Sequence, residues 1–325
     1  MVTALSARVK QNRAMDKTIT IVMGCTACGK GTVARSLAGH IEAEIVSVDS
    51  MKVYRRMDIG TAKPSADQRR SIPHHLIDVA EPSEAFSVAR YVSLADEAIE
   101  AIRARGRRVL AVGGTVLYLK ALTEGLFEGP SADEAIRAEL HDRGRQEGWA
   151  VLHEELAAVD PASAERIHPN DARRIVRALE VYRLTGEPIS KLQTQWQAEH
   201  RRFPCRFIGL RRDRADLNHR INQRVKRMIE KGLVEEVRSL LAEPRPLSQQ
   251  AAQAVGYAEI IRHLDGQYNL DEAVELIKIN SRQLAKSQRT WLRRFENVTW
   301  LDLAEDEDLE TVAADIADRL IDQSH

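Results

Sequence analysis

Near its N-terminus the chain reads Ile19-Thr20-Ile21-Val22-Met23-Gly24-Cys25-Thr26-Ala27-Cys28-Gly29-Lys30, an apolar run followed by a glycine-rich loop. A helical pattern comes next, and strand, glycine-rich loop and helix in this order are typical of a phosphate-binding loop. The glycines let backbone N–H groups turn toward an anion, the helix points its positive end at the same place, and Lys30 adds a mobile positive charge. The segment therefore predicts a polyphosphate-binding site.

The loop departs from the common pattern at the position after Lys30. Gly31 stands where a Ser or Thr usually offers a hydroxyl to Mg²⁺, and the hydroxyl comes one residue later, at Thr32. We predict Mg²⁺ as a cofactor, with Thr32 as its ligand directly or through water. The ending Lys30-Gly31-Thr32 also resembles that of nucleoside monophosphate kinases, so a kinase is an alternative.

The chain has 325 residues, enough for one large or two modest domains with a substantial core. Its 48 Lys and Arg balance 48 Asp and Glu, so the net charge alone indicates no partner. The charges are unevenly distributed, because residues 201–227 hold ten Lys or Arg against two Asp, and residues 302–322 hold nine acidic residues against one Arg. The sequence thus combines a basic body with an acidic C-terminal segment.

No segment has the pattern of a signal peptide or approaches about 18 uninterrupted apolar residues, the length that crosses a membrane. The three cysteines exclude a disulfide framework and fit a reducing compartment. Cys25 and Cys28 form a C-x-x-C pair, but a zinc site needs two further ligands and Cys205 stands alone, so we interpret both as small residues that fill the loop. We therefore expect a cytoplasmic protein without a membrane partner.

Short β-branched runs alternate with helical stretches along the chain. The runs lie at 19–23, 44–48, 75–79, 108–112, 206–210 and 298–301. Such alternation predicts an α/β fold with a P-loop NTPase-like, mainly parallel sheet flanked by helices. The expected organisation is an N-terminal extension at 1–17, a discontinuous core at 18–128 and 203–325, and an all-helical insertion at 129–202.

Helix signals replace strand signals within the predicted insertion. Ser131 and Glu134 have the spacing of a capping box, and Asn170-Asp171 precedes a helical pattern. Gly148 and Gly186 each follow such a pattern, as a glycine that ends a helix does.

Two strand ends carry candidate site residues. Asp49 follows the run at 44–48, and Thr115 follows the glycines after the run at 108–112. Ligands of open parallel sheets bind at the carboxyl ends of the strands, where Asp49 can take a proton or hold a metal, although an Asp there also commonly caps the next helix. No Asp ends the run at 108–112, so the metal-binding carboxylate of P-loop ATPases is absent there.

Basic residues in the C-terminal half follow helical spacing. One set steps by 4, 4, 3 and 4 residues: Lys278, Arg282, Lys286, Arg289 and Arg293. A second set steps by 4 and 3 residues: Arg220, Arg224 and Arg227. Each set forms a stripe on one helix face, which favours contact with the phosphates of a nucleic acid or of a diphosphate, with a solvated face as the alternative for either stripe alone.

Several motifs in a fixed order carry a resemblance to a known family. They are Asp49-Ser50-Met51-Lys52-Val53-Tyr54, Gly60-Thr61-Ala62-Lys63-Pro64, Pro73-His74-His75-Leu76-Ile77-Asp78, Gly113-Gly114-Thr115-x-Leu117-Tyr118, Asp171-x-Arg173-Arg174-x-x-Arg177-Ala178-Leu179-Glu180, Ala254-Val255-Gly256-Tyr257, Arg282-Gln283-Leu284-Ala285-Lys286 and Thr290-Trp291-Leu292-Arg293-Arg294. Together they resemble the tRNA dimethylallyltransferase family, also called tRNA isopentenyltransferases. The chain departs from the family at Cys25 and Cys28, where Pro and Ser are usual, at Gly31, where Ser or Thr is usual, and at Val116, which is often Gly.

The resemblance implies transfer of the dimethylallyl group from dimethylallyl diphosphate to the exocyclic amine of the adenosine just 3′ of the anticodon in tRNA, with release of diphosphate. It makes Asp49 the general base and gives Thr115 the task of positioning the base or the diphosphate. Arg224 matches the family's diphosphate arginine, with Arg220 as its neighbour. The amine is accessible only when the nucleotide is flipped out of its stack.

The resemblance also implies binding residues for both substrates. Those for the diphosphate are Gly24, Cys25, Thr26, Ala27, Cys28, Gly29, Lys30, Gly31 and Thr32. Those for the tRNA, with the helix stripe included, are Asp49, Ser50, Met51, Lys52, Thr115, Arg137, Arg173, Arg174, Ile175, Val176, Arg177, Ala254, Val255, Gly256, Tyr257, Ala258, Glu259, Arg282, Lys286 and Arg289. We expect a monomer whose insertion binds the anticodon stem-loop, mainly through shape and phosphates.

Two other functions remain open. A small-molecule or nucleotide kinase explains Lys30-Gly31-Thr32 and the sheet but neither the basic stripes nor the insertion. A P-loop ATPase that binds nucleic acid explains the stripes but requires a metal-holding Asp at the end of a strand after the helical region or at Val112. Neither explains the ordered motifs, and consumption of ATP in place of a prenyl diphosphate would distinguish both from the transferase.

Overall fold

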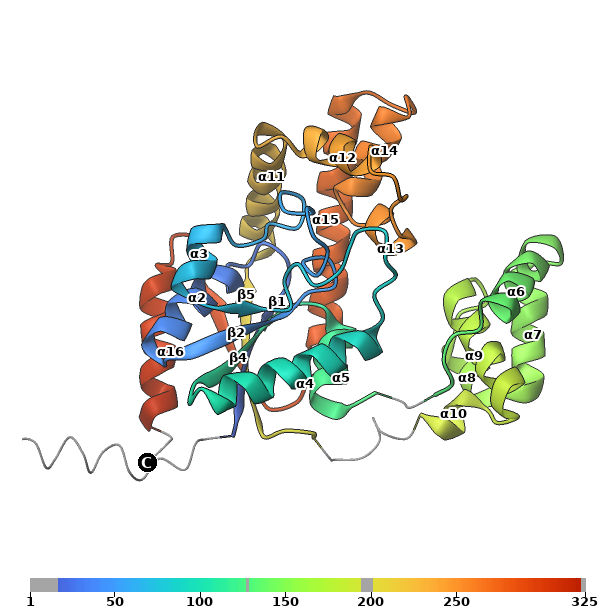
Figure 1. The fold of residues 1–325 in the computed structure, drawn as a ribbon, viewed down its shortest axis with the longest axis horizontal. Coiled ribbons are helices and arrows are strands. Elements are labelled where there is room, and N and C mark those ends of the chain that lie inside the picture. Colours follow the sequence, from blue (N-terminus) through green and yellow to red (C-terminus); the bar gives the residue numbers. More distant parts are fainter. Residues whose placement is uncertain (1–16, 127–128, 194–200, 323–325) are drawn as a thin grey trace, which may run out of the picture. The chain divides into compact units, whose positions relative to one another are not determined.

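The computed structural model describes residues 17–126, 129–193 and 201–322 (Figure 1). The chain folds into two compact units, one made of Met1–Thr123 with Phe203–His325 and the other of Glu124–Arg202. The second unit thus begins slightly before the insertion expected at 129–202. Of the expected N-terminal extension at 1–17, only Lys17 lies within the described residues.

The first unit contains a six-stranded sheet in the order β3-β2-β4-β1-β5-β6, and each pair of neighbouring strands is parallel. The strands are β1 (Ile19–Gly24), β2 (Ala43–Val48), β3 (His74–His75), β4 (Arg108–Gly113), β5 (Cys205–Arg212) and β6 (Val298–Leu303). The α/β prediction is therefore confirmed. β1 lies between β4 and β5 and is buried along its whole length, as an apolar strand in a parallel sheet should be.

Helices flank the sheet. In the first unit they are α2 (Lys30–His40), α3 (Ala66–Ser71), α4 (Val88–Ala104), α5 (Val116–Glu124), α11 (Arg214–Glu230), α12 (Leu233–Leu241), α13 (Gln249–Ala252), α14 (Tyr257–Leu264), α15 (Leu270–Leu292) and α16 (Leu309–Asp322). α16 carries part of the acidic C-terminal segment and packs against α2, the helix after the phosphate loop (Figure 1). None of the helices in the described ranges is both long and apolar enough to span a membrane.

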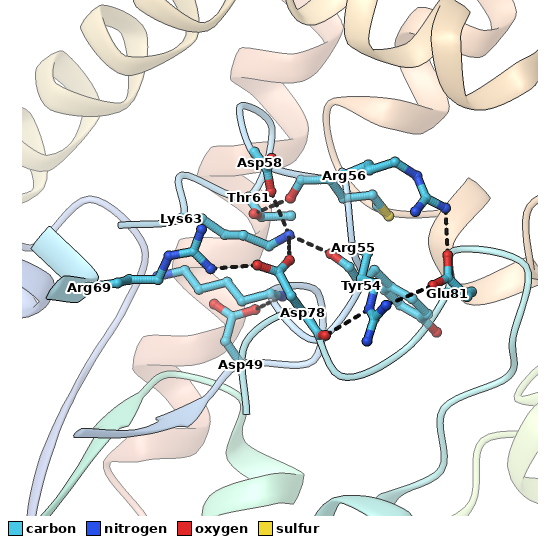
Figure 2. Close-up of polar contacts among 12 residues, drawn as sticks. Asp49, Tyr54, Arg55, Arg56, Asp58, Thr61, Lys63, Arg69, Asp78 and Glu81 are labelled. Atoms are coloured by element: carbon cyan, nitrogen blue, oxygen red, sulfur yellow. Dashed lines mark hydrogen bonds and ion pairs between the residues drawn. The ribbon is translucent and has the colours of Figure 1, made fainter. Parts of the chain in front are cut away.

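The third strand is shorter than the sequence pattern indicates. The pattern predicts a strand at 75–79, but β3 ends at His75, because Leu76 and Asp78 adopt positive φ angles of 63° and 58°. The Asp78 carboxylate instead binds Lys63 and Arg69 (Figure 2). After His75, ion pairs of Asp78 therefore take the place of further hydrogen bonding between β3 and β2.

The second unit consists of helices around a core of its own. They are α6 (Glu134–Gln146), α7 (Trp149–Val159), α8 (Pro161–Arg166), α9 (Ala172–Thr185) and α10 (Ile189–Leu192). Leu140, Leu152 and Leu156 are fully buried in this core, with Leu179 of α9 against them. Apolar residues at helical spacing thus explain why this part of the chain forms a compact helical unit.

The helix-end signals of this unit are only partly correct. The predicted capping box at Ser131 is wrong, because Asp133 caps α6 by accepting hydrogen bonds from two backbone N–H groups of its first turn. Asp171 caps α9, and Gly186 ends that helix with a φ of 73°, as predicted. Gly148 lies between α6 and α7 with a φ of 96°, also where the sequence indicates a helix end.

Candidate active site

Three strand ends meet at one edge of the sheet. β4 pairs with both β1 and β2, in a register that sets Met23 and Val48 beside Gly113. A Cβ at position 113 would lie 1.9 Å from the Val48 carbonyl oxygen, so only glycine fits there. The loops that follow these strands consequently bring the phosphate loop, Asp49 and Thr115 to the same edge, where open parallel sheets bind their ligands.

The phosphate loop turns tightly into α2. Gly29 has a φ of 101°, which favours glycine, and the helix begins at Lys30. Lys30 Nζ donates a hydrogen bond to the Cys25 carbonyl oxygen (3.0 Å), so its charge lies against the loop. Cys25 and Cys28 are buried and fill the loop from inside, since a Cβ on Gly24 would lie 2.6 Å from Cys28 Sγ. A hydrogen bond between the thiols, together with burial, raises the pKa of Cys25, which therefore stays protonated.

Asp49 lies just after β2, with its carboxylate held by the turn that follows. Oδ1 accepts hydrogen bonds from the backbone N–H groups of Met51 (2.9 Å) and Lys52 (3.3 Å). Within the described residues, Oδ2 has no hydrogen-bond partner. Asp49 can therefore act both as a cap of the turn and as a base, because Oδ1 fixes the orientation of the side chain and Oδ2 can accept a proton.

Two side chains join the loops of the site into one frame. Thr115 Oγ1 accepts a hydrogen bond from the Ser50 N–H (3.1 Å). Gln288 of α15 accepts at Oε1 from the Thr26 N–H (2.8 Å) and donates from Nε2 to the Gly114 carbonyl (3.0 Å). Gln288 was not predicted from the sequence, because it is uncharged, is 262 residues from Thr26 and lies between Lys286 and Arg289 in the chain.

Positively charged side chains surround this frame. Arg224 of α11 donates from Nη1 to Thr26 Oγ1 (2.9 Å), so the structure brings this predicted arginine to the phosphate loop. Burial and the charges of Lys30 and Arg224 lower the pKa of Lys52 to about 8. The Asp49 carboxylate acts on Lys52 in the opposite direction. The site therefore concentrates positive charge around one carboxylate, an environment suited to a bound anion.

The structure does not bring Arg220 into contact with the loop. Its Nε donates to Oδ1 of Asp216 (2.7 Å), whose Oδ2 accepts from the buried Arg212 (3.0 Å). Arg212 also donates to the Cys28 carbonyl oxygen (3.1 Å). Arg220 is thus connected to the loop through Asp216 and Arg212, in place of the direct role expected from the sequence.

The first turn of α2 offers no hydroxyl at the position after Lys30. Gly31 has none, and the exposed Thr32 lies about 100° further around the helix. In the part of the chain that the structure describes, no group of three or more His, Cys, Asp or Glu side chains is arranged to hold a metal ion. The role of Thr32 as a metal ligand stays a prediction.

A network of ion pairs fixes the loop between β2 and β3 (Figure 2). The Lys63 side chain is 2% exposed, and its Nζ lies 2.7 Å from carboxylate oxygens of both Asp58 and Asp78. Arg69 binds the second oxygen of Asp78. Asp49 lies beside this network in Figure 2, and these ion pairs of Lys63 and Arg69 do not include it.

The segment at 254–259, predicted to contact tRNA, lies largely inside the first unit. Tyr257 OH donates to Glu236 (2.6 Å), and the Glu236 carboxylate also accepts the backbone N–H groups of loop residues 58–60. Glu259 is buried as well. Tyr257 therefore helps to position the loop after β2, and Glu259 accepts hydrogen bonds from the Gly256 N–H and from Asn280. Both side chains are buried and offer little surface to an RNA.

The predicted tRNA stretch on α9 has two kinds of side chain. Ile175 and Val176 are buried in the core of the second unit, so their side chains are not available to an RNA. Arg173 and Arg174 are exposed on the same helix. The sequence prediction for this stretch consequently rests on its arginines.

A buried carboxylate organises two further arginines of the second unit. Glu180 is fully buried and forms ion pairs with Arg137 (2.8 Å) and Arg177 (2.6 Å). Both arginine side chains remain about one-third exposed, at 34% and 32%. Glu180 therefore holds two predicted tRNA contacts in fixed positions while part of each stays accessible.

The basic stripe on α15 is also divided. Arg282 donates to Asn222 of α11 (2.8 Å), so it connects two packed helices. Lys286 is exposed and Arg289 is partly exposed. The residues of this stripe that can meet an RNA phosphate are therefore chiefly Lys286 and Arg289.

The sheet order and the phosphate loop define a P-loop α/β protein, and the end of β4 lacks the metal-holding carboxylate of P-loop ATPases. Comparison with known protein families identifies one family whose profile covers most of this chain. The profile of the family described as IPP transferase matches residues 52–295. The chain belongs to this family.

Individual relatives are similar over most of the chain. The tRNA dimethylallyltransferases of Geobacter metallireducens and Geobacter sulfurreducens are 49% and 46% identical to it, covering 87% and 90% of this chain and 92% and 94% of theirs. The crystal structure of a tRNA isopentenylpyrophosphate transferase from Bacillus halodurans is 40% identical with a TM-score of 0.68, over 95% of this chain and 98% of that one. A eukaryotic dimethylallyltransferase captured acting on tRNA is 28% identical with a TM-score of 0.76, over 94% of this chain and 78% of that one.

Proposed function

We propose that the protein transfers the dimethylallyl group of dimethylallyl diphosphate to the exocyclic amine of the adenosine just 3′ of the anticodon in tRNA, and releases diphosphate. Family membership and the names of the relatives support this proposal. The observation that carries it is the position of Asp49, whose Oδ1 is fixed and whose Oδ2 is unpaired within the described residues, at the edge where cations gather.

The phosphate loop would stabilise the leaving group. As the bond between the prenyl carbon and the diphosphate oxygen breaks, negative charge accumulates on the diphosphate. Arg224 is held beside the loop by its hydrogen bond to Thr26, and Lys30 would exchange its hydrogen bond to the Cys25 carbonyl for one to the diphosphate. A preorganised cationic site of this kind lowers the barrier without reorganisation during the reaction.

Asp49 would complete the transfer. The adenosine amine loses a proton as its nitrogen bonds to the prenyl carbon, and Asp49 Oδ2 is the acceptor that the geometry offers. Thr115, joined to Ser50 by a hydrogen bond, keeps the strand end that carries Asp49 in register with the turn after β4. Proton removal and leaving-group stabilisation would thus occur on opposite sides of one reacting carbon.

Mg²⁺ would be bound by the diphosphate and by water molecules, because the loop has no hydroxyl at Gly31.

The helical unit would bind the anticodon stem-loop through Arg137, Arg173, Arg174 and Arg177. Since its substrate is tRNA, we place the reaction in the cytoplasm, with a monomer as the working form.

A labelling experiment tests the function. The protein is incubated with Mg²⁺, labelled dimethylallyl diphosphate and unmodified tRNA, and label is expected on one adenosine of the anticodon loop with release of one diphosphate per transfer. An anticodon stem-loop fragment should also be labelled if the helical unit reads local shape. Turnover of ATP with no label on RNA would sink the transferase proposal and favour the kinase.

The contribution of α15 to tRNA binding can be measured separately. Replacing Lys286 and Arg289 by Ala should weaken tRNA binding and flatten the slope of log affinity against log salt by about 0.7 to 0.9 per lost phosphate contact. Arg107→Ala is the matched control, because Arg107 precedes β4 at the opposite edge of the sheet. An unchanged salt slope in the double variant would mean that these side chains are merely solvated.

A further inference from the structure

Arg35 is a further cation beside the phosphate loop. Arg35 lies one helical turn after Gly31 on α2, and side chains of a helix lean toward its N-terminus. Its Nη1 lies 3.4 Å from the point that a Cβ at position 31 would occupy. The guanidinium therefore lies in contact with position 31, at the end of the helix that faces a bound phosphate.

Arg35 is half-buried and lacks an internal partner. Throughout residues 17–126, 129–193 and 201–322, no carboxylate or carbonyl oxygen forms an ion pair or hydrogen bond with it, and burial lowers its pKa. This contrasts with the arginines of the neighbouring loop, such as Arg69, which binds Asp78. A guanidinium that has lost part of its hydration without gaining a partner is costly, and this indicates that its partner is a ligand.

Arg35 adds to the positive field of the site. The charge of Arg35 contributes to the lowered pKa of Lys52, together with burial and the charges of Lys30 and Arg224. Burial, with smaller contributions from the charges of Arg35 and Lys52, lowers the pKa of His74 to about 4, so His74 is neutral at pH 7. Four cations thus act around one carboxylate, an excess of positive charge that a bound diphosphate can neutralise.

We propose that Arg35 is a further diphosphate-binding residue, whose guanidinium contacts the leaving diphosphate at the place where other P-loops position a hydroxyl and its Mg²⁺. The inference rests on the proposed function, since it identifies diphosphate as the anion. A guanidinium can bind two phosphate oxygens at once, and its charge is permanent. A Cβ at position 31 would be in van der Waals contact with Arg35 Nη1, so Gly31 lies directly beside the guanidinium.

The consequence is a diphosphate site that depends less on metal. If Arg35 supplies positive charge where Mg²⁺ is usually held, the protein should bind inorganic pyrophosphate in the presence of EDTA. Removing the Arg35 charge should weaken that binding more in EDTA than in Mg²⁺, because the metal can replace part of the lost charge.

The test is calorimetric titration of inorganic pyrophosphate into the parent protein, Arg35→Gln, Arg35→Leu and Arg35→Lys, each in EDTA and in Mg²⁺. In EDTA, Arg35→Gln and Arg35→Leu should bind about 10-fold to 100-fold more weakly than the parent, the scale of a lost hydrogen bond to a charged group. Arg35→Lys should recover part of the affinity because it keeps the charge. Arg107→Gln, at the opposite edge of the sheet, should bind as the parent does.

Two results would overturn the inference. One is a folded Arg35→Gln or Arg35→Leu protein, judged by circular dichroism, that binds pyrophosphate as tightly as the parent in EDTA. The other is a loss of tRNA affinity with pyrophosphate affinity unchanged, which would assign Arg35 to an RNA phosphate. Pyrophosphate binding is measured without tRNA, so failure of the labelling experiment and failure of this inference are separate outcomes.

Discussion

Asp49→Asn is expected to lower the rate of a single turnover by about 10²-fold or more, the scale of losing a positioned general base, while tRNA affinity changes little. The Asn side chain has the same shape, and its oxygen can still accept the N–H groups of Met51 and Lys52 that now bind Oδ1. What it cannot do is take the proton of the amine. The variant therefore separates the chemistry of the carboxylate from its structural role.

The measurement is rapid-quench transfer of labelled dimethylallyl groups to saturating tRNA, with tRNA affinity determined on the same protein. Glu42→Gln serves as a matched control, because it removes a carboxylate just before β2, at the edge of the sheet away from the site. A rate for Asp49→Asn within about threefold of the parent would show that another group is the base.

The sequence predicts most of the fold because its strongest signals are local. A glycine-rich loop between an apolar run and a helical pattern can be recognised from neighbouring residues alone. β1, β2 and β4 end at Gly24, Val48 and Gly113, each within one residue of the predicted end. Since ligands bind where such strands end, the sequence could also place Asp49 and Thr115 at the site.

Contacts that depend on the tertiary fold were not accessible in the same way. Gln288 reaches Thr26 across 262 residues, and nothing in its spacing marks it as a site residue. Tyr257 and Glu259 belong to a stretch that was interpreted as a tRNA contact, yet both are buried: Tyr257 supports the loop after β2 through Glu236, and Glu259 binds Asn280 of α15. A family motif indicates that a residue matters, but only burial distinguishes contact with a substrate from support of the residues that make the contact.

The departures of this chain from the usual phosphate loop are also related in space. Cys28 fills the loop under Gly24, and Gly31 leaves room for the guanidinium of Arg35. From the sequence, Gly31 was simply the loss of a metal ligand. The structure instead shows a glycine and an arginine one helical turn apart that are compatible with each other, which a single-position comparison cannot reveal.

Lys30→Met is expected to reduce turnover by about 10² to 10³-fold, the scale of removing one preorganised donor to a developing negative charge. The Met side chain has a similar length and keeps the apolar stem, so the first turn of α2 should be unaffected. Lys30 at present donates to the Cys25 carbonyl, a contact that a bound diphosphate would replace. Pyrophosphate affinity should fall with turnover, in contrast to Asp49→Asn, which should leave it nearly unchanged.

A second measurement on Lys30→Met follows the pKa of Lys52, with circular dichroism as the check that the variant is folded. The charge of Lys30 contributes to holding the pKa of Lys52 at about 8, below its usual value. Removing that charge relieves the repulsion, so the pKa of Lys52, followed by NMR of its side-chain amine, should rise. Unfolding would move the same pKa to its usual value and abolish pyrophosphate binding, but it would also abolish the circular dichroism signal. Lys17→Met, before β1 at the opposite edge of the sheet, should change neither the pKa of Lys52 nor pyrophosphate binding.

A folded Lys30→Met protein with parental turnover and an unchanged pKa of Lys52 would contradict this prediction. Lys30 would then lie too far from the reacting diphosphate to act on it, and Arg224 and the loop backbone would have to stabilise the negative charge alone.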